Sequence, residues 1–337
     1  MIKEAIKNLV SGRSLTREEA ASVMKEIMAG EATPAQFGAF VTALRLKGET
    51  VDEIVGLARV MRAKAMPVNI SGPVVDTCGT GGDGAGTFNI STAAAFVAAG
   101  AGLRVAKHGN RAMSSHCGSA DVLEALGVKI DLDAEPVRRC LEEVGIGFMF
   151  APLFHPAMKY AASPRREIGI RTVFNILGPL TNPAGARAQV VGVADELLVK
   201  KLASVLQGLG CCHALVVHGD DGLDEITIAG RSRVCEIKEG DLRSYTVSPE
   251  DFGLARAELA SLKGGSAGEN AELLRRVLAG DPGPRRDAVV MNAAAALVAG
   301  DRVVTLKDGV ALAEEVIDSG RALAKLERLI DFSQSLN

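Results

Sequence analysis

The stretch DTCGTGGDGAGTFNIST, residues 76–92, decides the fold that we expect for this chain. An apolar run at 73–76 leads into it, five glycines follow within residues 79–86, and a helical pattern opens near Asn89. Glycines let main-chain N–H groups approach an anion closely, and the first turn of a helix presents free N–H groups with a partial positive charge. The order strand, glycine-rich loop, helix therefore predicts a loop that binds a phosphate group.

This loop does not match the Walker phosphate-binding pattern. No lysine follows Gly86, so GxxxxGK[ST] is absent. A flexible connector with an asparagine helix cap is the alternative, and it explains the cluster of glycines less well. Ser91 and Thr92 add hydroxyl groups in the first helical turn, where they can contact phosphate or metal-bound oxygen atoms.

Short Val- and Ile-rich runs alternate with helical stretches on both sides of this loop. We expect strands at 73–76, 103–106, 147–150, 189–193 and 214–217, with helices at 89–99, 119–126, 197–209 and 288–298. Such alternation is typical of crossover units, which form a mainly parallel sheet covered by helices on both faces. Residues 231–247 change to a strand-turn-strand pattern, which predicts an antiparallel extension at one end of the sheet.

The N-terminal residues predict a separate helical unit. Thr16 precedes Glu19 by three residues, and Thr50 precedes Glu53 in the same way, so both pairs can form capping boxes. Thr33-Pro34 predicts another helix start between them. We therefore expect an α/β protein with a small N-terminal helical bundle, residues 1–68, and a larger α/β domain, residues 73–330. Residues 163–187 are helical in pattern without a flanking strand, and we expect part of them to join the bundle.

A second polar turn follows the next expected strand. Residues 104–111 read RVAKHGNR, so Lys107, His108, Asn110 and Arg111 lie near the carboxyl end of that strand. Ligands bind at this edge in open parallel sheets. KHGNR by itself is an ordinary polar turn, but one crossover after a glycine-rich loop its two cations predict a site for a second phosphate group. Ser114, Ser115 and Ser119 add hydroxyl groups before another helix.

A pair of carboxylates ends a further apolar strand. In ALVVHGDDGLDEIT, residues 214–227, Asp224 and Glu225 follow a glycine turn. Such pairs are often only solvated, yet carboxylates that face a phosphate site repel the ligand unless a hard cation lies between them. Mg²⁺ suits this place, because it is usually held by one or two carboxylates together with substrate phosphates. His218 has no partner at metal-ligand spacing, and we expect it to be structural.

Composition excludes several classes of protein. The 337 residues carry 38 Lys and Arg against 41 Asp and Glu, a net charge of −3, and they include only two Tyr and no Trp. Nucleic-acid binding usually needs a basic excess or stacking aromatics, so we expect no nucleic-acid partner. No apolar run approaches the roughly 20 residues of a membrane span, and six cysteines lack CxxC spacing. We therefore expect a cytoplasmic protein with reduced thiols and no membrane contact.

Taken together, the motifs resemble those of the anthranilate phosphoribosyltransferase family. The resemblance runs from about residue 3 to about residue 330, and pyrimidine nucleoside phosphorylases share this fold and a related glycine loop. It is carried by GTGGD at 79–83, NIST at 89–92, KHGNRAMSS at 107–115, HPAM from His155, LGPLTNPA at 177–184, HGDDGLDE at 218–225 and QFGAFVTALRLKGET at 36–50.

The resemblance implies a reaction, a metal and a set of site residues. The family transfers the phosphoribosyl group of 5-phosphoribosyl 1-pyrophosphate to the amine of anthranilate, in L-tryptophan biosynthesis, with Mg²⁺ and as a homodimer through the N-terminal helical domain. The residues implied at the phosphoribosyl pyrophosphate site are Gly79, Gly82, Asp83, Thr87, Asn89, Ile90, Ser91, Thr92, Lys107, His108, Gly109, Asn110, Arg111, Ala112, Met113, Ser114, Ser115 and Ser119. Those implied for anthranilate are Gly79, Asn110, Arg165, His108, His155 and Pro179, and those for the metal are Ser91, Asp224 and Glu225.

No catalytic acid or base is expected, because the carbon that loses pyrophosphate has oxocarbenium character and an aromatic amine can attack it directly. Arg165 in SPRREIGIRT is by itself an ordinary solvated helix charge, with Arg166 beside it. The resemblance assigns it instead to the anthranilate carboxylate, which a guanidinium can pair with. A nucleoside phosphorylase of the same fold and a non-catalytic nucleic-acid-binding relative are the alternatives. The first predicts a different segment in place of KHGNR and LGPLTNPA, and the second predicts surplus positive charge.

Overall fold

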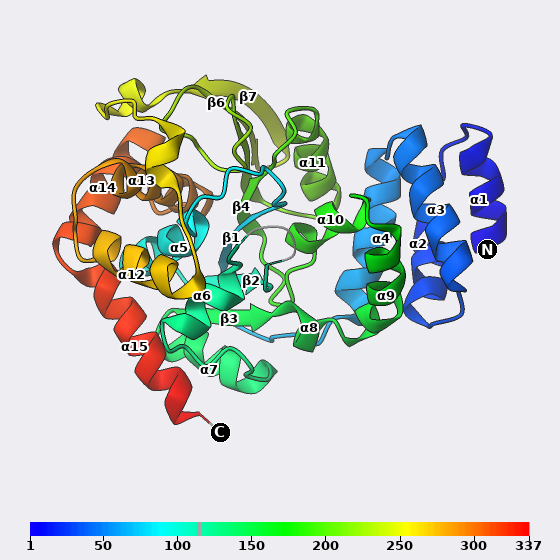
Figure 1. Ribbon diagram of the computed structural model, residues 1–337, viewed down its shortest axis with the longest axis horizontal. Coiled ribbons are helices and arrows are strands. Elements are labelled where there is room, and N and C mark those ends of the chain that lie inside the picture. The colour runs from blue at the N-terminus through cyan, green and yellow to red at the C-terminus, as the bar shows by residue number, and fades with distance from the viewer. Residues whose placement is uncertain (113–115, 337) are drawn as a thin grey trace.

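The computed structural model describes residues 1–112 and 116–336, and its larger part is built on one seven-stranded sheet (Figure 1). The strand order is β3-β2-β1-β4-β5-β6-β7, in which the first five strands are parallel and β6 and β7 are antiparallel additions at one end. The strands are β1 (Val75–Gly79), β2 (Val105–Gly109), β3 (Ile146–Phe150), β4 (Ala188–Gly192), β5 (His213–Gly219), β6 (Ser232–Lys238) and β7 (Asp241–Val247). The predicted parallel sheet with an antiparallel extension is confirmed.

The glycine-rich loop leaves the sheet at the point where the strand order reverses. β1 pairs with β2 on one side and with β4 on the other, and Gly79 at its carboxyl end lies opposite Gly192 of β4. Ligands bind in the crevice that opens at such a switch point in parallel α/β sheets. The topology therefore places residues 79–89 where a ligand site is expected.

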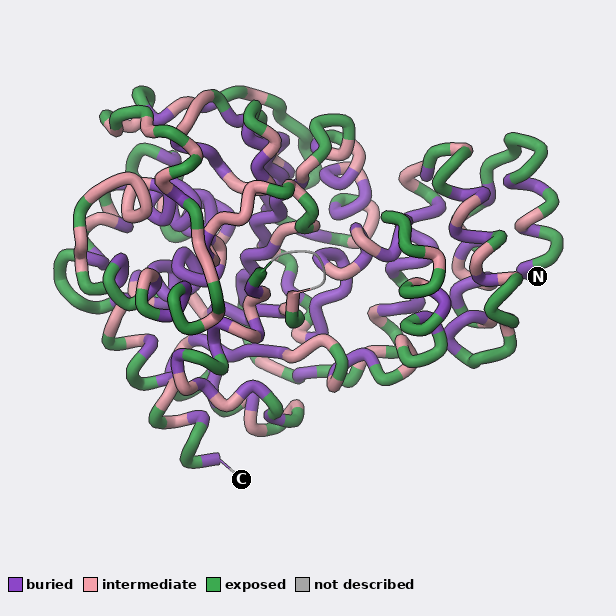
Figure 2. Tube along the Cα trace, viewed as in Figure 1, coloured by how far each residue is buried: buried purple, intermediate pink, exposed green. Residues whose placement is uncertain are grey.

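Helices cover both faces of the sheet, and two of them are buried on all sides. These are α5 (Ile90–Gly100) and α13 (Pro284–Ala299), whose alanine-rich segments 93–99 and 293–299 are almost wholly inaccessible (Figure 2). A helix that is apolar all round is typical of the interior of a larger domain. The other helices of this part are α6 (Ser119–Ala125), α7 (Ala134–Glu143), α8 (Ala151–Phe154), α11 (Leu197–Gly208), α12 (Ala267–Leu278), α14 (Leu306–Asp318) and α15 (Arg321–Ser335).

The N-terminal helices form a bundle beside the sheet, at the right in Figure 1. The bundle consists of α1 (Ile2–Val10), α2 (Arg17–Met28), α3 (Pro34–Lys47) and α4 (Val51–Lys64). The side chains of Thr16, Thr33 and Thr50 each accept a hydrogen bond from the main chain three residues later, which completes three capping boxes. These local bonds satisfy N–H groups that a helix start otherwise leaves without partners, and they explain why the chain begins a helix at each of these points.

A later segment packs against this bundle. Helix α9 (Lys159–Ile168) contacts α2 and α3, and α10 (Phe174–Leu177) contacts α4. The ring centroids of Phe37 and Phe174 are 5.2 Å apart. The same apolar cluster continues through α11 to Val191 and Val216 on one face of the sheet. The bundle and the sheet therefore share a core.

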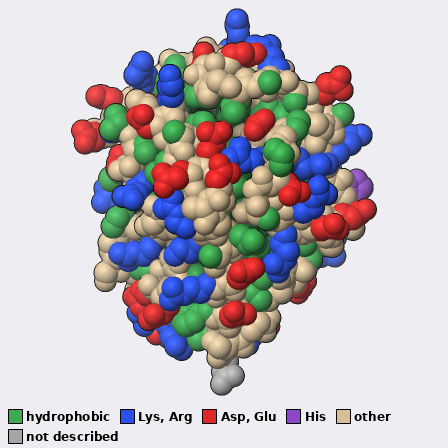
Figure 3. Space-filling view, turned by 90° about the vertical axis from the view of Figure 1, so that its left-hand side faces the viewer, with side chains coloured by type: hydrophobic (Ala, Val, Ile, Leu, Met, Phe, Trp, Pro, Cys, Tyr) green, Lys and Arg blue, Asp and Glu red, His purple; other side chains and the backbone are tan. Residues whose placement is uncertain are grey.

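The surface of the α/β part carries mixed charge. On the face drawn in Figure 3, Lys and Arg side chains are interspersed with Asp and Glu. Among the residues that the structure describes, no helix is both long and apolar enough to cross a membrane. All six cysteines are free, and only Cys212 is exposed. Cys211 and Cys212 are adjacent but not joined, as the constrained geometry of neighbouring cysteines predicts.

Candidate active site

The glycine-rich loop after β1 needs its glycines for conformation. Gly81, Gly82, Gly84 and Gly86 all have φ angles between +63° and +82°. Side chains strongly disfavour this left-handed region, whereas glycine enters it readily. The main-chain N–H of Gly81 donates a hydrogen bond of 2.7 Å to Oδ2 of Asp224. The loop is thus tied to one of the two predicted metal-binding carboxylates.

Two further glycines let Asp224 approach the strand ends. A Cβ atom on Gly79 would overlap Oδ2 of Asp224, and a Cβ on Gly192 would overlap its main-chain carbonyl oxygen. Gly79 ends β1 and Gly192 ends the neighbouring strand β4. The acidic turn therefore packs directly onto the carboxyl edge of the sheet, where the sequence places the metal.

The carboxylates at this edge lack enough positive charge to balance them. Burial, followed by repulsion from Asp83, raises the pKa of Asp224 to about 7. Burial and the charge of Asp224 raise the pKa of Glu225 well above its usual range, although Lys107 opposes the rise. Oε1 of Glu225 accepts a hydrogen bond of 3.1 Å from the N–H of Ser91. Carboxylates that repel one another in this way fit a hard cation between them.

Mg²⁺ would be held here by few protein ligands. Within residues 1–112 and 116–336, no group of three or more His, Cys, Asp or Glu side chains is arranged to enclose a metal ion. This agrees with the usual mode of Mg²⁺ binding, in which one or two carboxylates act with substrate phosphates and water. Asp224 and Glu225 are the two carboxylates that the sequence analysis assigns to the metal, and both lie at this edge of the sheet.

Lys107, predicted at the phosphate site, is buried in the sheet. Lys107 is only 3% exposed, and its Nζ donates a hydrogen bond of 2.6 Å to the carbonyl oxygen of Thr77 in β1. Burial lowers the pKa of Lys107, while the nearby Asp76, Cys78 and Glu225 act to raise it. The ammonium therefore lies inside the sheet, where it offsets carboxylate charge.

Asp76 is a buried acid that the sequence prediction did not assign to the site. It is fully inaccessible, and burial raises its pKa to about 6, against the opposing charge of Lys107. Nδ2 of Asn182 donates to Oδ2 of Asp76 at 2.7 Å and to the carbonyl oxygen of Ala106 at 2.8 Å. Asn182, from LGPLTNPA, thus joins β1 and β2 near the residues at which these strands begin. The LGPLTNPA motif was the available signal for it.

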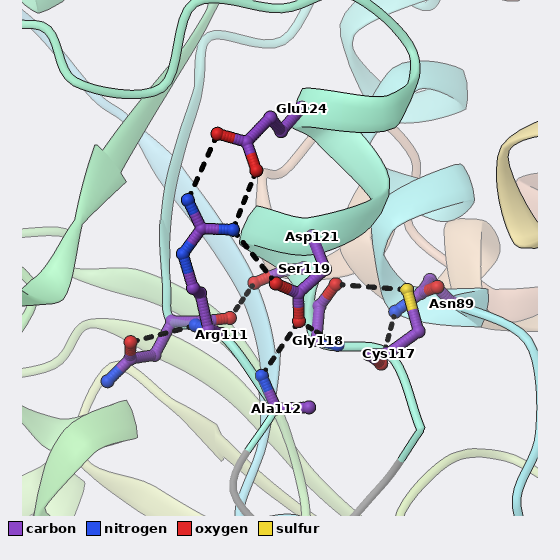
Figure 4. Close-up of polar contacts among 9 residues, drawn as sticks. Asn89, Arg111, Ala112, Cys117, Gly118, Ser119, Asp121 and Glu124 are labelled. Atoms are coloured by element: carbon purple, nitrogen blue, oxygen red, sulfur yellow. Dashed lines mark hydrogen bonds and ion pairs between the residues drawn. The ribbon is translucent and has the colours of Figure 1, made fainter. Parts of the chain in front are cut away.

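Arg111 is paired with acidic side chains rather than left open for phosphate. Its Nη1 and Nη2 atoms donate to Glu124 at 2.7 and 3.0 Å, and Nη1 also donates to Asp121 at 3.1 Å (Figure 4). The other carboxylate oxygen of Asp121 accepts from the N–H groups of Ala112 and Gly118, both at 2.9 Å. In this geometry Arg111 holds the turn against α6.

The rest of this turn is closely packed. A Cβ atom on Gly109 would overlap Oγ of Ser119, so the turn and the start of α6 touch. Ile90 is buried, and Asn110 is exposed beside Ser119. The predicted residues Met113, Ser114 and Ser115 lie outside the residues that the structure describes.

Asn89 does not act as a helix cap, although it stands at the N-cap position of α5. Its Nδ2 donates to the carbonyl oxygen of Cys117 at 3.1 Å (Figure 4), and its Oδ1 accepts from Nδ2 of Asn270 at 3.0 Å. Thr87 forms an isolated bridge with Lys263. These contacts fix the end of the glycine-rich loop from two sides, which disfavours the alternative of a flexible connector. Asn270 was missed, because its segment carries no motif.

The hydroxyl of Thr92 is buried. Of the groups that the structure describes, none forms a hydrogen bond with its Oγ1. Ser91, one residue earlier, is partly exposed.

Two buried histidines stand side by side near the predicted anthranilate site. The ring centroids of His108 and His155 are 5.0 Å apart. Burial, then the neighbouring His155, lowers the pKa of His108 to about 3, and burial lowers that of His155 to about 4. Both rings are therefore neutral near pH 7. Pro179 is also buried.

Arg165 and Arg166 differ in their surroundings. Arg165 is partly buried, its guanidinium carbon lies 5.4 Å from the centre of the Phe174 ring, and burial lowers its pKa. Arg166 is exposed. Neither arginine lies within 4.0 Å of a carboxylate oxygen in the described part of the chain. A partly buried, unpaired guanidinium is suited to an anionic ligand.

Arg171 contacts the glycine-rich loop, which the sequence did not predict. Its Nη2 donates to the carbonyl oxygens of Gly81 and Thr80, at 2.7 and 3.3 Å. It thus reaches from the segment between α9 and α10 to the glycine-rich loop.

Comparison with known families agrees with this architecture. Residues 3–65 match the model of a glycosyl transferase family, helical bundle domain, and residues 71–323 match that of a glycosyl transferase family, a/b domain. The fold and the site thus define a glycosyltransferase.

Comparison with individual relatives identifies the family more closely. The chain is 64% identical over 335 residues to the anthranilate phosphoribosyltransferase of Chloroflexus aggregans, covering 99% of this chain and 98% of the relative. The crystal structure of the Thermus thermophilus enzyme of that name has a TM-score of 0.93 at 49% identity, covering 98% of this chain and 99% of that one. The chain belongs to the anthranilate phosphoribosyltransferase family.

A solved structure of the Saccharomyces cerevisiae enzyme, in complex with PRPP and Mg, is also similar. Its TM-score is 0.91 at 30% identity, over 99% of this chain and 98% of that one.

Proposed function

We propose that the carboxyl edge of the sheet, between the glycine-rich loop and α9, is the active site of an anthranilate phosphoribosyltransferase. The enzyme transfers the phosphoribosyl group of 5-phosphoribosyl 1-pyrophosphate to the amine of anthranilate, releasing pyrophosphate, in L-tryptophan biosynthesis. The observation that carries this proposal is the contact of Asp224 with the loop N–H of Gly81, which joins an acidic metal site to an anion-binding loop.

Ser91, Asp224 and Glu225 are the proposed Mg²⁺ ligands. Burial, and then repulsion from neighbouring carboxylates, raise the pKa values of both carboxyl groups, and a divalent cation would offset that repulsion. The structure of the yeast relative, which is in complex with PRPP and Mg, supports Mg²⁺ as the metal. When bound, Mg²⁺ supplies charge neutralisation for the departing pyrophosphate.

The chain's own part in the reaction is to position substrates and to neutralise charge. The N–H groups of the glycine-rich loop are already fixed when the substrate arrives. Binding an anion there therefore costs little free energy of reorganisation. The proposed phosphoribosyl pyrophosphate site keeps the residues implied by the resemblance. Two of them act indirectly: Lys107 offsets carboxylate charge from inside the sheet, and Arg111 holds its turn through Glu124 and Asp121.

Anthranilate is proposed to bind on the side of the helical bundle. Arg165 pairs with its carboxylate, while Gly79, Asn110 and Pro179 shape the pocket. The neutral rings of His108 and His155 give this pocket polar but uncharged walls. An aromatic amine needs no strong base to attack a carbon with oxocarbenium character, so no acid or base residue is proposed.

We also propose how the chain is divided and assembled. Residues 1–68, joined by α9 and α10, form a helical unit, and residues 73–330 form the α/β unit. A homodimer through this unit is proposed from the family resemblance. A cytoplasmic location is supported by six free cysteines, which are typical of reducing compartments.

Anthranilate fluorescence tests the proposed function. The chain mixed with phosphoribosyl pyrophosphate, anthranilate and Mg²⁺ should consume the fluorescent anthranilate, and chelation of the metal should stop the reaction. A pyrimidine nucleoside with inorganic phosphate is the comparison. Turnover of the nucleoside without turnover of anthranilate would replace this function by that of a nucleoside phosphorylase.

A further inference from the structure

One residue of the glycine-rich loop, Gly81, is held by hydrogen bonds on both its N–H and its carbonyl oxygen. The N–H of Gly81 donates to Oδ2 of Asp224 at 2.7 Å, and its carbonyl oxygen accepts from Nη2 of Arg171, also at 2.7 Å. Asp224 belongs to the proposed metal site, whereas Arg171 belongs to the segment that follows Arg165. Gly81 is therefore the point at which three parts of the site meet.

Arg171 fixes two successive peptide planes of this loop. It binds the carbonyl oxygens of Thr80 and Gly81. In a trans peptide the C=O and the following N–H point in opposite directions. Holding the Thr80 carbonyl therefore turns the Gly81 N–H toward Asp224, as observed, and holding the Gly81 carbonyl turns the Gly82 N–H away from Arg171. The guanidinium thus sets the direction of two N–H groups in the anion-binding loop.

The chain is built to let the guanidinium reach the loop. A Cβ atom on Gly82 would overlap Nη1 of Arg171, and Gly82 has a φ of +82°. Arg171 can reach the loop only because position 82 carries no side chain, and a ligand needs the same space. Within residues 1–112 and 116–336, no carboxylate oxygen lies within 4.0 Å of Arg171, so loop carbonyls are its polar partners there.

The segment that carries Arg171 is itself firmly placed. Helix α9 ends at Gly169 in the left-handed conformation, with φ of +67°, and the Gly169 N–H donates to the carbonyl oxygen of Arg165. On the other side, the N–H of Thr172 donates to Oδ1 of Asn175 at 2.9 Å, and Thr172 is buried. Arg171 therefore lies six residues after Arg165, in an exposed connection that is anchored by the end of α9 on one side and by Thr172 on the other.

We propose that Arg171 is a positioning residue that couples the two substrate sites, an inference that rests on the proposed function. Arg171 holds the loop carbonyls in the structure as it stands, and a carboxylate bound at Arg165 restrains the α9–α10 connection and so favours this arrangement. The Gly81 N–H then stays on Asp224, and the Gly82 N–H stays turned away from Arg171, before phosphoribosyl pyrophosphate arrives. Binding free energies are reciprocal, so each ligand should tighten the binding of the other.

Benzoate tests this coupling without turnover, because it has the carboxylate of anthranilate but no amine. Calorimetry would measure the Kd of phosphoribosyl pyrophosphate with Mg²⁺, in the absence and presence of saturating benzoate. The wild-type chain should bind about 5-fold or more tightly with benzoate, the lower end of typical couplings. Arg171→Gln should reduce this factor to about 1, because a neutral amide cannot hold both carbonyls with charge-assisted bonds.

Two further variants complete the experiment. Arg171→Lys should give an intermediate factor, since an ammonium can donate to a carbonyl but lacks the planar fork. Arg166→Gln is the matched control, because Arg166 lies on the same segment and is exposed. It should keep the wild-type factor. Thermal unfolding establishes that each variant is folded.

The outcomes separate this inference from the proposed function. Two results would overturn the coupling role while anthranilate turnover still stands. In the first, benzoate leaves the Kd of phosphoribosyl pyrophosphate unchanged in the wild-type chain. In the second, benzoate tightens binding to a folded Arg171→Gln variant as much as to the wild type. Should Arg171→Gln not fold, Arg171→Lys decides: an intermediate factor supports the role and an unchanged one overturns it. Failure of the wild-type chain to consume anthranilate refutes the proposed function instead.

Discussion

The ammonium nitrogen of Lys107 donates a hydrogen bond of 2.6 Å to the carbonyl oxygen of Thr77, inside the sheet. The hydroxyl of Thr77 donates in turn to the carbonyl oxygen of Ser91, at 2.9 Å. One buried cation is thus connected through β1 to the first turn of α5. It also lowers the pKa of Asp76 and Glu225, against the effect of their burial. A lysine on the site edge of the sheet therefore organises the site without being exposed.

Replacement of Lys107 by methionine tests this role. The side chains are similar in length, so the change removes the charge and the hydrogen bond with little loss of volume. We expect a loss of about 1.5–3 kcal/mol in the free energy of unfolding, typical of a hydrogen bond to a charged group. Weaker binding of phosphoribosyl pyrophosphate should accompany it. Urea unfolding and calorimetry measure the two effects.

Lys200→Met is the control for this substitution, because Lys200 is exposed on α11. It should change stability by no more than about 0.5 kcal/mol. Equal stability of the two variants would show that the buried ammonium contributes nothing to the fold.

Activity should depend on Mg²⁺ in a pH-sensitive way. The pKa of Asp224 is raised to about 7, and a carboxyl group must lose its proton before it can bind a metal. The Mg²⁺ concentration needed for half-maximal turnover should therefore rise as the pH falls below about 7, by about tenfold per pH unit for one competing proton. Mg²⁺ titrations of turnover at pH 6 and pH 8 measure this.

Removing the carboxylates provides the matched comparison. Asp224→Asn combined with Glu225→Gln should lose most turnover while the chain remains folded. Asp220→Asn, an exposed acid on the same turn, should behave as the wild type. Unchanged turnover of the double variant at limiting Mg²⁺ would remove both residues from the metal site.

A buried histidine away from the site should make stability depend on pH. Nδ1 of His213 lies 2.8 Å from Asp301 and Nε2 lies 3.0 Å from Glu236. Burial disfavours the imidazolium, but the bonds to Glu236 and Asp301 outweigh it, and the pKa of His213 is raised. Its contribution is then complete below the unfolded pKa of roughly 6.5 and is lost as the pH rises through the folded value.

His213→Gln reports this contribution. The difference in unfolding free energy between wild type and variant should be about 1.5–3 kcal/mol at pH 6 and smaller at pH 9. Urea unfolding at the two pH values measures it. Nζ of Lys238 also lies near this pair, 3.6 Å from Asp301. A difference that grew with pH would mean that the ring is neutral in the folded chain.

Local patterns predicted most of the fold. Some features depend only on residues a few positions away, so they can be recognised in the sequence. They include the capping boxes at Thr16 and Thr50 and the glycines after β1. The same holds for the strands, whose side-chain pattern and flanking turns are local. Even the pairing of Arg111 was open to prediction, because Asp121 and Glu124 are three residues apart on one helix face.

Contacts between distant segments were not predictable in this way. Asn182 meets Asp76 across 106 residues, and Asn270 meets Asn89 across 181. Both contacts depend on which strands become neighbours. Arg171 depends further on a loop conformation with positive φ angles, which leaves its carbonyls turned outward. Lys107 shows the remaining difficulty: a motif identifies a charged residue, but only the packed sheet decides whether its charge faces the ligand or the interior.

The most discriminating prediction concerns Arg165 and its neighbour. Arg165 is partly buried against Phe174 without a carboxylate partner among the described residues, whereas Arg166 is exposed. Arg165→Ala should raise the KM for anthranilate by about 10- to 150-fold, since a hydrogen bond to a charged group contributes about 1.5–3 kcal/mol. The KM for phosphoribosyl pyrophosphate, measured at low anthranilate, should change little. Arg165→Lys should recover part of the loss, because an ammonium lacks the planar two-pronged contact. Arg166→Ala should leave both KM values unchanged, and an anthranilate defect in that variant alone would move the carboxylate site to Arg166. If neither variant raised the KM for anthranilate, its carboxylate would have to bind away from α9.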